Sequence, residues 1–282
     1  MFAEFKHTLR RLRGHIIGWG IGIAALGLLI VAFYGVFQER QEDFLKMIEG
    51  YPPEFLAFFG GDASSLARPE GFLGMYGFSM LPLIFGIFAV IAGSGLLAGD
   101  EEGGRLDLML AYPVSRSAFL WGRVLAFVGA TIAILVIGWL GFCVLLGRSA
   151  LDVTWGEMAL PFLSLLAQAL IYGALALLLA SLLPSRGLAA TVAGLVLVTS
   201  YMLSSLSALD ANLASVAQLL PYAYYQSGEA LDGLNLTWFL GLLLVSALFA
   251  VLAWWRFEKR DIRVSGEHGW RLPRLLRLPG RG

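Results

Sequence analysis

Long apolar segments separated by short polar ones are the feature that most constrains the fold of this chain. Residues 73–98 contain no Asp, Glu, Lys or Arg, and residues 119–147 contain one charged side chain, Arg123. At about 1.5 Å per helical residue, six segments can cross about 30 Å of hydrocarbon. They lie near residues 15–37, 73–98, 118–147, 157–183, 187–208 and 236–256. We therefore expect an all-α integral membrane protein with six transmembrane helices.

The composition supports this class and argues against an enzyme. Of the 282 residues, 58% are hydrophobic and 14% are charged, whereas about a quarter of a soluble domain is charged. The chain has no G-x-x-x-x-G-K-[ST], H-E-x-x-H or G-x-S-x-G motif, so we expect it to bind no cofactor, nucleotide or metal and to have no catalytic residues. The single cysteine, Cys143, lies in an apolar run and is expected to be a packing residue.

The distribution of Lys and Arg predicts the orientation in the membrane. Sixteen of these residues fall on one side of the predicted spans and four on the other. The richer side holds the N-terminus, residues 99–117, the turn at 184–187 and the segment after the last span. Because basic residues mark the cytoplasmic side, both termini are expected in the cytoplasm.

The N-terminal segment is amphipathic. Four apolar residues recur at helical spacing with Lys6, Arg10 and Arg13 between them: Phe2, Phe5, Leu9 and Leu12. This pattern predicts an interfacial helix lying on the inner leaflet before the first span. The alternative is a basic flank that only fixes the orientation of that span.

Two external segments are too long and too apolar for plain turns. Residues 38–72 contain "YPPEFLAFFGG", in which Pro52 and Pro53 can start a short helix, and residues 209–235 contain "QLLPYAYYQSG". Both are expected to be interfacial or re-entrant pieces that enter the outer leaflet.

The spans carry few polar groups. Gln168 is the one strongly polar side chain near the middle of a span, and its expected role is an interhelical hydrogen bond. A transporter coupled to protons or sodium needs an ionisable residue at membrane depth. If this protein moves a solute uphill, we therefore expect the energy to come from another chain.

Small and hydroxyl-bearing residues in the first and fifth spans are candidates for a subunit interface or a transport pathway. They are Gly14, Gly18, Gly22, Ala190, Gly194, Ser200 and Ser204. Small residues four apart allow close helix packing, so an internal packing seam is the alternative for the glycines. Hydroxyls bonded to their own helix backbone are the alternative for the serines.

The charged segment 99–117, between the second and third spans, cannot lie in hydrocarbon. It opens with Asp100, Glu101 and Glu102, and continues into the short run "RLDLMLAY", which Pro113 follows closely. In that run Leu106, Met109 and Leu110 share one helical face. A short amphipathic helix held between two rigid spans is suited to docking in a groove of a cytosolic partner. The alternative is a membrane-surface helix without a partner.

This segment resembles the coupling segment of the permease subunits of type 2 ABC exporters, which has the form acid-x-x-G-[TR]-L-[ED]-x-[LM]-L-x-x-P-[VI]-S-R. The chain reads Glu101-Glu102-Gly103-Gly104-Arg105-Leu106-Asp107-Leu108-Met109-Leu110, then Pro113-Val114-Ser115-Arg116. Arg105 and Asp107 stand where Thr and Glu are commoner. "PPEFL" at 52–56, "PEGF" at 69–72 and "RFEKRDI" at 256–262 also match, so the resemblance covers nearly the whole chain.

The resemblance implies a permease domain over residues 1–262, followed by a basic cytoplasmic tail at 263–282. It implies a second permease subunit, the same or different, and two ATPase subunits that bind ATP and Mg²⁺. It also implies a bacterial-type cytoplasmic membrane. The residues that would couple to the ATPase are Glu101, Glu102, Arg105, Leu106, Asp107, Met109, Leu110, Pro113, Ser115 and Arg116.

The apolar spans with scattered hydroxyls suit an amphipathic or lipid-like substrate better than an ion or a sugar. Two other functions stay open at this point. The chain can be a membrane anchor that transmits conformational change in an ABC-type complex and moves no solute. An integral membrane enzyme is the third hypothesis, although no constellation of catalytic residues supports it.

Overall fold

A computed structural model describes residues 1–52, 68–97, 115–207 and 210–259. The part of the chain so described is helical, with no strand, and it contains six helices or helix pairs that are long and apolar enough to cross a membrane. These are α1 (Phe2–Glu39), α9 (Trp155–Leu182), α10 (Arg186–Leu206), α12 (Leu236–Lys259) and two composite spans. The second span, Pro69–Gly95, consists of α4 (Pro69–Phe72), the π-helix η2 (Leu73–Phe78) and α5 (Leu81–Gly95). The third span, Arg116–Arg148, consists of α8 (Arg116–Cys143) and the 3₁₀ helix η3 (Leu146–Arg148). The six predicted spans are confirmed.

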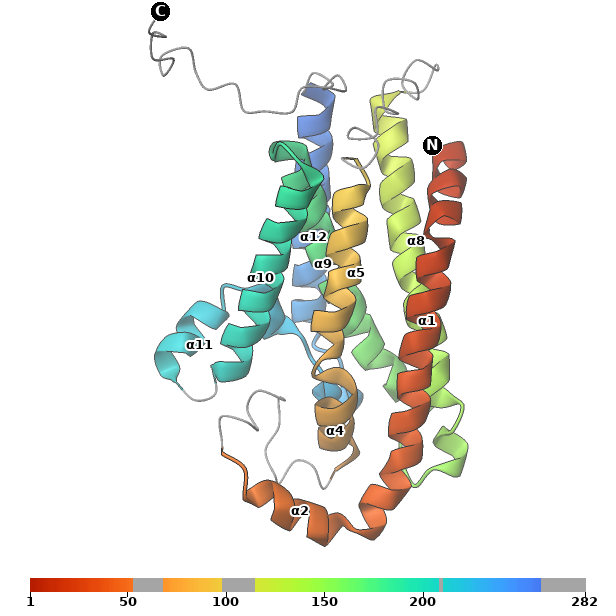
Figure 1. Ribbon diagram of the computed structural model, residues 1–282, viewed down its shortest axis with the longest axis vertical. Coiled ribbons are helices and arrows are strands. Elements are labelled where there is room, and N and C mark those ends of the chain that lie inside the picture. Colours follow the sequence, from red (N-terminus) through yellow and green to blue (C-terminus); the bar gives the residue numbers. More distant parts are fainter. Residues whose placement is uncertain (53–67, 98–114, 208–209, 260–282) are drawn as a thin grey trace, which may run out of the picture.

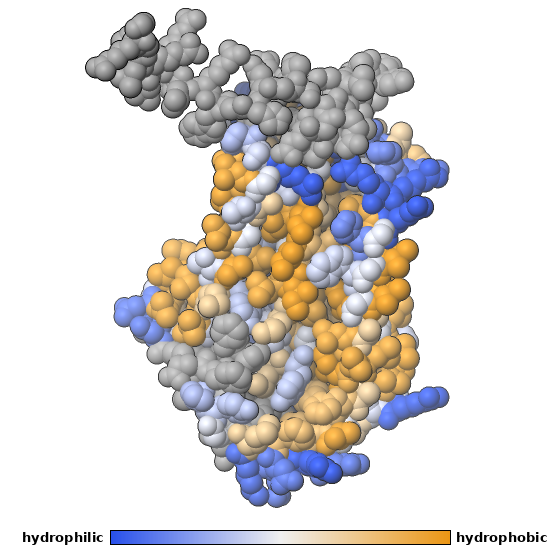
Figure 2. All heavy atoms as spheres, in the orientation of Figure 1, coloured by the Kyte–Doolittle hydropathy of each residue, from blue (hydrophilic) through white to orange (hydrophobic). Residues whose placement is uncertain are grey.

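The long helices run side by side along the long axis of the molecule (Figure 1). Phe2 and Lys259, the first residue of α1 and the last of α12, lie at the same end. We call this the terminal end and the opposite one the distal end. On the face that Figure 2 shows, hydrophobic residues cover most of the surface between the two ends. Hydrophilic residues gather at the ends themselves. This distribution is typical of a multi-pass membrane protein.

Helix α9 forms the centre of the bundle. In its most apolar window 61% of the residues are buried, against 28% in α1 and 22% in α12. It packs against α5, α8, α10 and α12. A Thr154–Glu157 capping box begins the helix: Glu157 N donates to Thr154 Oγ1, and Thr154 N donates to Glu157 Oε2. These bonds satisfy backbone groups that would otherwise lack partners at the helix start.

The predicted separate interfacial helix at the N-terminus is wrong. Helix α1 runs without interruption for 38 residues, about 57 Å at the usual rise, so Phe2, Phe5, Leu9 and Leu12 belong to its first turns. These turns pack on α8, where glycines leave room. A Cβ atom at Gly122 would lie 2.7 Å from Met1 O, and one at Gly129 would lie 3.8 Å from the Phe5 ring. The apolar stripe therefore packs partly against α8, although the Phe2 side chain remains exposed.

The first span packs through glycines other than those predicted. A Cβ atom at Gly141 of α8 would lie 2.3 Å from Ala24 Cα, and one at Gly27 of α1 would lie 2.1 Å from the Phe142 ring. By contrast, Gly14, Gly18 and Gly22 have no atom within 4 Å of such a position. The internal-seam alternative is therefore wrong for these three glycines, whose face is open.

The two segments that the sequence places outside the spans form short helices around the distal end. Helix α2 (Gln41–Glu49) follows α1 and crosses the end of the bundle (Figure 1). The predicted short helix after Pro52 lies outside the described residues. Residues 210–235 form α11 (Ala211–Ala217) and the 3₁₀ helices η4 (Pro221–Tyr224) and η5 (Gly228–Asp232).

Candidate functional site

Most of the predicted coupling segment lies outside the described residues. This is true of Glu101, Glu102, Arg105, Leu106, Asp107, Met109, Leu110 and Pro113. Ser115 and Arg116 are described, as are Leu96 and Leu97 on the other flank. The candidate site is therefore the pair of anchors that hold the two flanks of residues 98–114 on the bundle.

The C-terminal flank is anchored to α12. Ser115 Oγ accepts a hydrogen bond from Ala118 N and so caps the start of α8. Arg116 Nη1 donates to Phe257 O and Glu258 O, both at 3.5 Å. A guanidinium is stabilised beside the last carbonyls of a helix because they carry partial negative charge. Arg116, which the sequence assigned to coupling, thus joins the start of α8 to the end of α12.

Side chains strengthen the same junction. Ser117 Oγ donates to the carboxylate of Glu258, and Trp254 Nε1 donates to Ser117 Oγ at 3.0 Å. The Trp121 and Trp254 rings lie 6.4 Å apart. Sequence reasoning missed Glu258 and Ser117 because residues about 140 positions apart in the chain give no local signal.

The N-terminal flank is anchored by Arg123, which is 2% exposed. Its Nη1 donates to Leu96 O at 2.6 Å, just after the end of α5. Its Nε lies 3.6 Å from a carboxylate oxygen of Glu4 on α1, and its Cζ lies 3.9 Å from the centre of the Phe119 ring. One side chain of α8 therefore contacts both α1 and the end of α5.

The sequence itself indicates that Arg123 needs a partner. Arg123 is the single charge in a long apolar segment and was counted only toward orientation. A buried cation is costly unless it is paired and hydrogen-bonded, so an isolated arginine in a span predicts a partner. Glu4, near the N-terminus, is that partner.

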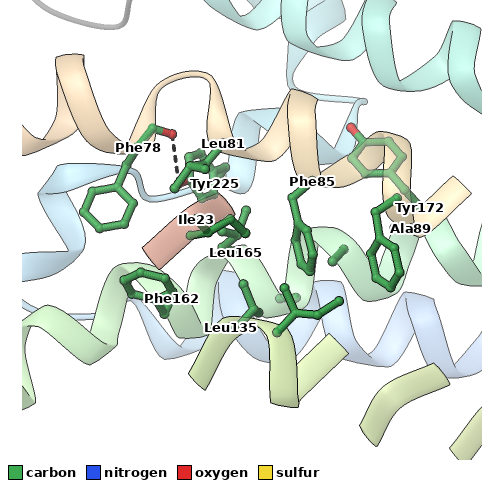
Figure 3. Close-up of a cluster of buried hydrophobic side chains, with 14 of the residues drawn as sticks. Ile23, Phe78, Leu81, Phe85, Ala89, Leu135, Phe162, Leu165, Tyr172 and Tyr225 are labelled. Atoms are coloured by element: carbon green, nitrogen blue, oxygen red, sulfur yellow. Dashed lines mark hydrogen bonds between the residues drawn. The ribbon is translucent and has the colours of Figure 1, made fainter. Parts of the chain in front are cut away.

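The distal end of the second span is broken. A π-helix, η2 (Leu73–Phe78), is followed by a bend, and Pro82 stands in the first turn of α5. Proline has no N–H to donate to the carbonyl four residues earlier, which is Phe78 O. Tyr225 Oη donates to this oxygen at 3.1 Å, as Figure 3 shows. Tyr222 Oη donates to the next carbonyl, Ser79 O, at 2.9 Å.

Burial keeps both tyrosines in the donor form. It raises the pKa of Tyr222 and of Tyr225 well above the usual value for a phenol, so each hydroxyl keeps its proton. In a low-dielectric site, carbonyls freed by a helix break need such donors.

Residues 221–226, which carry the two tyrosines, are themselves held by hydrogen bonds to α9 and α10. Gln168 Nε2 donates to Pro221 O at 2.6 Å, Tyr222 N donates to Ser200 Oγ at 2.9 Å, and Gln226 N donates to Ser164 Oγ at 3.0 Å. Gln168 thus bonds a backbone carbonyl of η4 rather than another span. Ser200 is buried and holds Tyr222, which explains its hydroxyl without a pathway.

Helix α5 connects the two regions. Near its terminal end a Cβ atom at Gly93 would lie 2.2 Å from Gly173 O of α9, so the two backbones touch. Phe85 and Phe88 are buried and stack with ring centres 5.2 Å apart. Helix α5 therefore links the anchor at Leu96 to the broken distal end of the second span.

The chain matches a known protein family. The family described as "Multidrug efflux system permease Rv1217c, C-terminal domain" matches residues 6–258, which is most of the chain. No curated protein matches the chain.

Proposed function

Because the chain belongs to the family of the multidrug efflux system permease Rv1217c, C-terminal domain, we propose that it is the membrane-spanning subunit of an ATP-driven exporter of the type 2 ABC class. The chain is then a non-catalytic permease, and ATP and Mg²⁺ bind a separate ATPase subunit. A multidrug family supports an amphipathic or lipid-like substrate.

The anchoring of both flanks of residues 98–114 is the observation that carries this proposal. A coupling helix transmits force only when its ends are fixed to the spans that must move. Arg123 fixes one flank to α1, α5 and α8, and Arg116 fixes the other to α8 and α12. The terminal end then faces the cytoplasm of a bacterial-type cell, where two ATPase subunits dock.

In the proposed mechanism ATPase closure displaces the 98–114 segment and, through Leu96, the terminal end of α5. The tight α5–α9 contact carries this movement to the distal end. There the π-helix and its bend can change shape, since the tyrosines replace missing backbone bonds with side-chain bonds that can exchange. Release of Tyr222 and Tyr225 would open the outer side.

A second permease subunit, the same or different, completes the proposed assembly. The open face of Gly14, Gly18 and Gly22 supports a contact there, because small residues let two helices approach closely. Ala190 and Gly194 of α10 are the second candidate surface, and Gly194 likewise has no atom within 4 Å of a Cβ position.

Coupling is tested by Leu106→Asp, with Leu108→Asp as a matched control on the other face of the predicted helix. We expect the ATPase to copurify with the native chain and with Leu108→Asp. Leu106→Asp should lower transport-stimulated ATP hydrolysis at least about tenfold, since a buried charge in a docking groove costs more than about 1.4 kcal/mol. Equal activity of both variants would contradict the coupling role.

The same preparation separates the exporter from an anchor that moves no solute. Sealed inverted vesicles should accumulate an amphipathic dye when ATP is present. The lack of any ATP-dependent accumulation, combined with normal copurification of the ATPase, would favour the anchor.

A further inference from the structure

A basic cavity of about 220 Å³ lies at the terminal end between α1, α5 and α8, and it reaches the start of α10. Its basic lining residues are Arg11 and His15 of α1, Arg123 of α8 and Arg186 of α10, and Thr8 of α1 adds a hydroxyl group. Among the described residues that line it there is no carboxylate. Hydrophilic residues gather on the surface beside this part of α1 (Figure 2).

The cationic groups come from three helices that are distant in sequence. Arg123 is held by Leu96 O, Glu4 and the Phe119 ring, so its position is fixed. Arg186 Nη2 donates to Ile91 O of α5 at 3.2 Å. Guanidinium groups match the geometry of phosphate oxygens and bind them by paired hydrogen bonds.

The cavity also has an apolar side that leads toward lipid. Leu12, Ile91 and Leu96 line it. A second cavity of about 360 Å³ shares Ile91 and Arg186 with it and continues between α5 and α10 along Gly187 and Ala190. Ile91 is 43% exposed, so this groove opens on the flank of the bundle.

We propose that this cavity binds the phosphate group of an anionic phospholipid from the leaflet at the terminal end. Basic pockets between spans are typical sites for acidic lipid headgroups. The phosphate lies among Arg11, Arg123 and Arg186, and the acyl chains follow the groove past Ile91 and Ala190. A free phosphate ion offers the same anionic chemistry without the apolar part.

The consequence is a lipid that joins α1 and α10. Arg11 of α1 and Arg186 of α10 both line the cavity, and the bound phosphate bridges these two arginines. This site does not depend on the ATPase or on the exported substrate, so it stands apart from the proposed function.

The test measures ligand binding to the purified full-length chain. Native mass spectrometry in mild detergent counts bound phosphatidylglycerol against phosphatidylcholine, and a parallel titration uses inorganic phosphate. Arg11→Gln and Arg186→Gln each remove one cavity charge. Arg13→Gln is the control, because it removes an exposed charge from the same helix that does not line the cavity.

We expect phosphatidylglycerol to bind in preference to phosphatidylcholine, and each cavity variant to weaken it about fivefold. Arg13→Gln should change it less than twofold. Binding of inorganic phosphate alone, weakened by the same two variants, would identify a soluble source for the same phosphate site. Equal losses in all three variants, or no preference for an anionic ligand, would overturn the proposal.

Discussion

Two tyrosines illustrate how single hydroxyls stabilise an irregular span. A break in a transmembrane helix exposes carbonyls in a region without water, where each unsatisfied group is costly. Tyr222 and Tyr225 reach these carbonyls from a segment more than 140 positions away. The aromatic rings also fill the space beside the π-helix, with the Tyr201 and Tyr222 ring centres 5.2 Å apart.

Replacing Tyr225 with Phe removes one buried hydrogen bond and keeps the ring. We expect a loss of about 1–2 kcal/mol, which corresponds to a melting temperature lower by about 2–8 °C. A thiol-reactive dye can follow unfolding, because the single cysteine, Cys143, is buried.

Tyr224→Phe is the matched control. Tyr224 Oη donates to Gln218 O at 2.8 Å at an exposed site, where water can replace the bond. The melting temperature of the Tyr224→Phe protein should differ from that of the native chain by less than about 1 °C. Equal losses in the two variants would show that the Tyr225 hydroxyl has no special role at the break.

Glycines bring two pairs of helix backbones into close contact. The α1–α8 pair depends on Gly141 against Ala24, and the α5–α9 pair on Gly93 against Gly173. In a membrane, small residues allow this approach and increase dispersion contact between helices.

Gly141→Ala should separate α1 from α8. The added Cβ would lie 2.3 Å from Ala24 Cα, a backbone atom that cannot turn away. Overpacking of this kind costs about 1–3 kcal/mol, which the same thiol assay detects as a lower melting temperature. Gly241→Ala in α12 is the control, since no atom lies within 4 Å of its Cβ position; there the better helix propensity of Ala should keep or raise the melting temperature. Unchanged stability of Gly141→Ala would contradict the packing role.

The spans were predictable from sequence because length and hydrophobicity suffice to define a helix that crosses a membrane. The faces of those helices were not. Gly14, Gly18 and Gly22 have the spacing of a packing seam, yet the α1–α8 contact uses Gly20 and Gly27. Spacing gives a stripe on a helix, but only the neighbouring helix decides whether that stripe is covered.

The same limit explains the error at the N-terminus and the missed anchors. An apolar stripe at residues 2–12 fits a lipid surface or a protein surface equally well, and α8 provides the protein surface. The motif of the 99–117 segment could be read directly from the sequence. Its anchors, Arg123 with Glu4 and Arg116 with the end of α12, require the fold to bring distant residues together.

For the whole molecule, the arrangement of the two ends constrains how the protein acts. The anchors of residues 98–114 and the basic cavity share the terminal end, whereas the broken span and the tyrosines lie at the distal end. A signal applied at one end must therefore travel along the spans, and α5 is one of the helices that contact both regions.

This arrangement predicts a definite sidedness, which thiol labelling can measure. In a Cys143→Ser background, single cysteines are introduced as Lys6→Cys and Lys259→Cys at the terminal end, and as Glu42→Cys and Asp232→Cys at the distal end. All four native residues are exposed, so access depends on the side of the membrane rather than on burial. A membrane-impermeant maleimide should label positions 42 and 232 in intact cells.

Positions 6 and 259 should react only in inverted vesicles, because the excess of Lys and Arg at the terminal end favours its retention in the cytoplasm. Labelling of 6 and 259 from outside would reverse the orientation and remove the 98–114 segment from any cytosolic ATPase. A mixed pattern, with 6 and 42 on the same side, would mean that α1 does not cross the membrane. Either result would exclude the proposed coupling mechanism, since force applied in the cytoplasm must reach α5 at its terminal end.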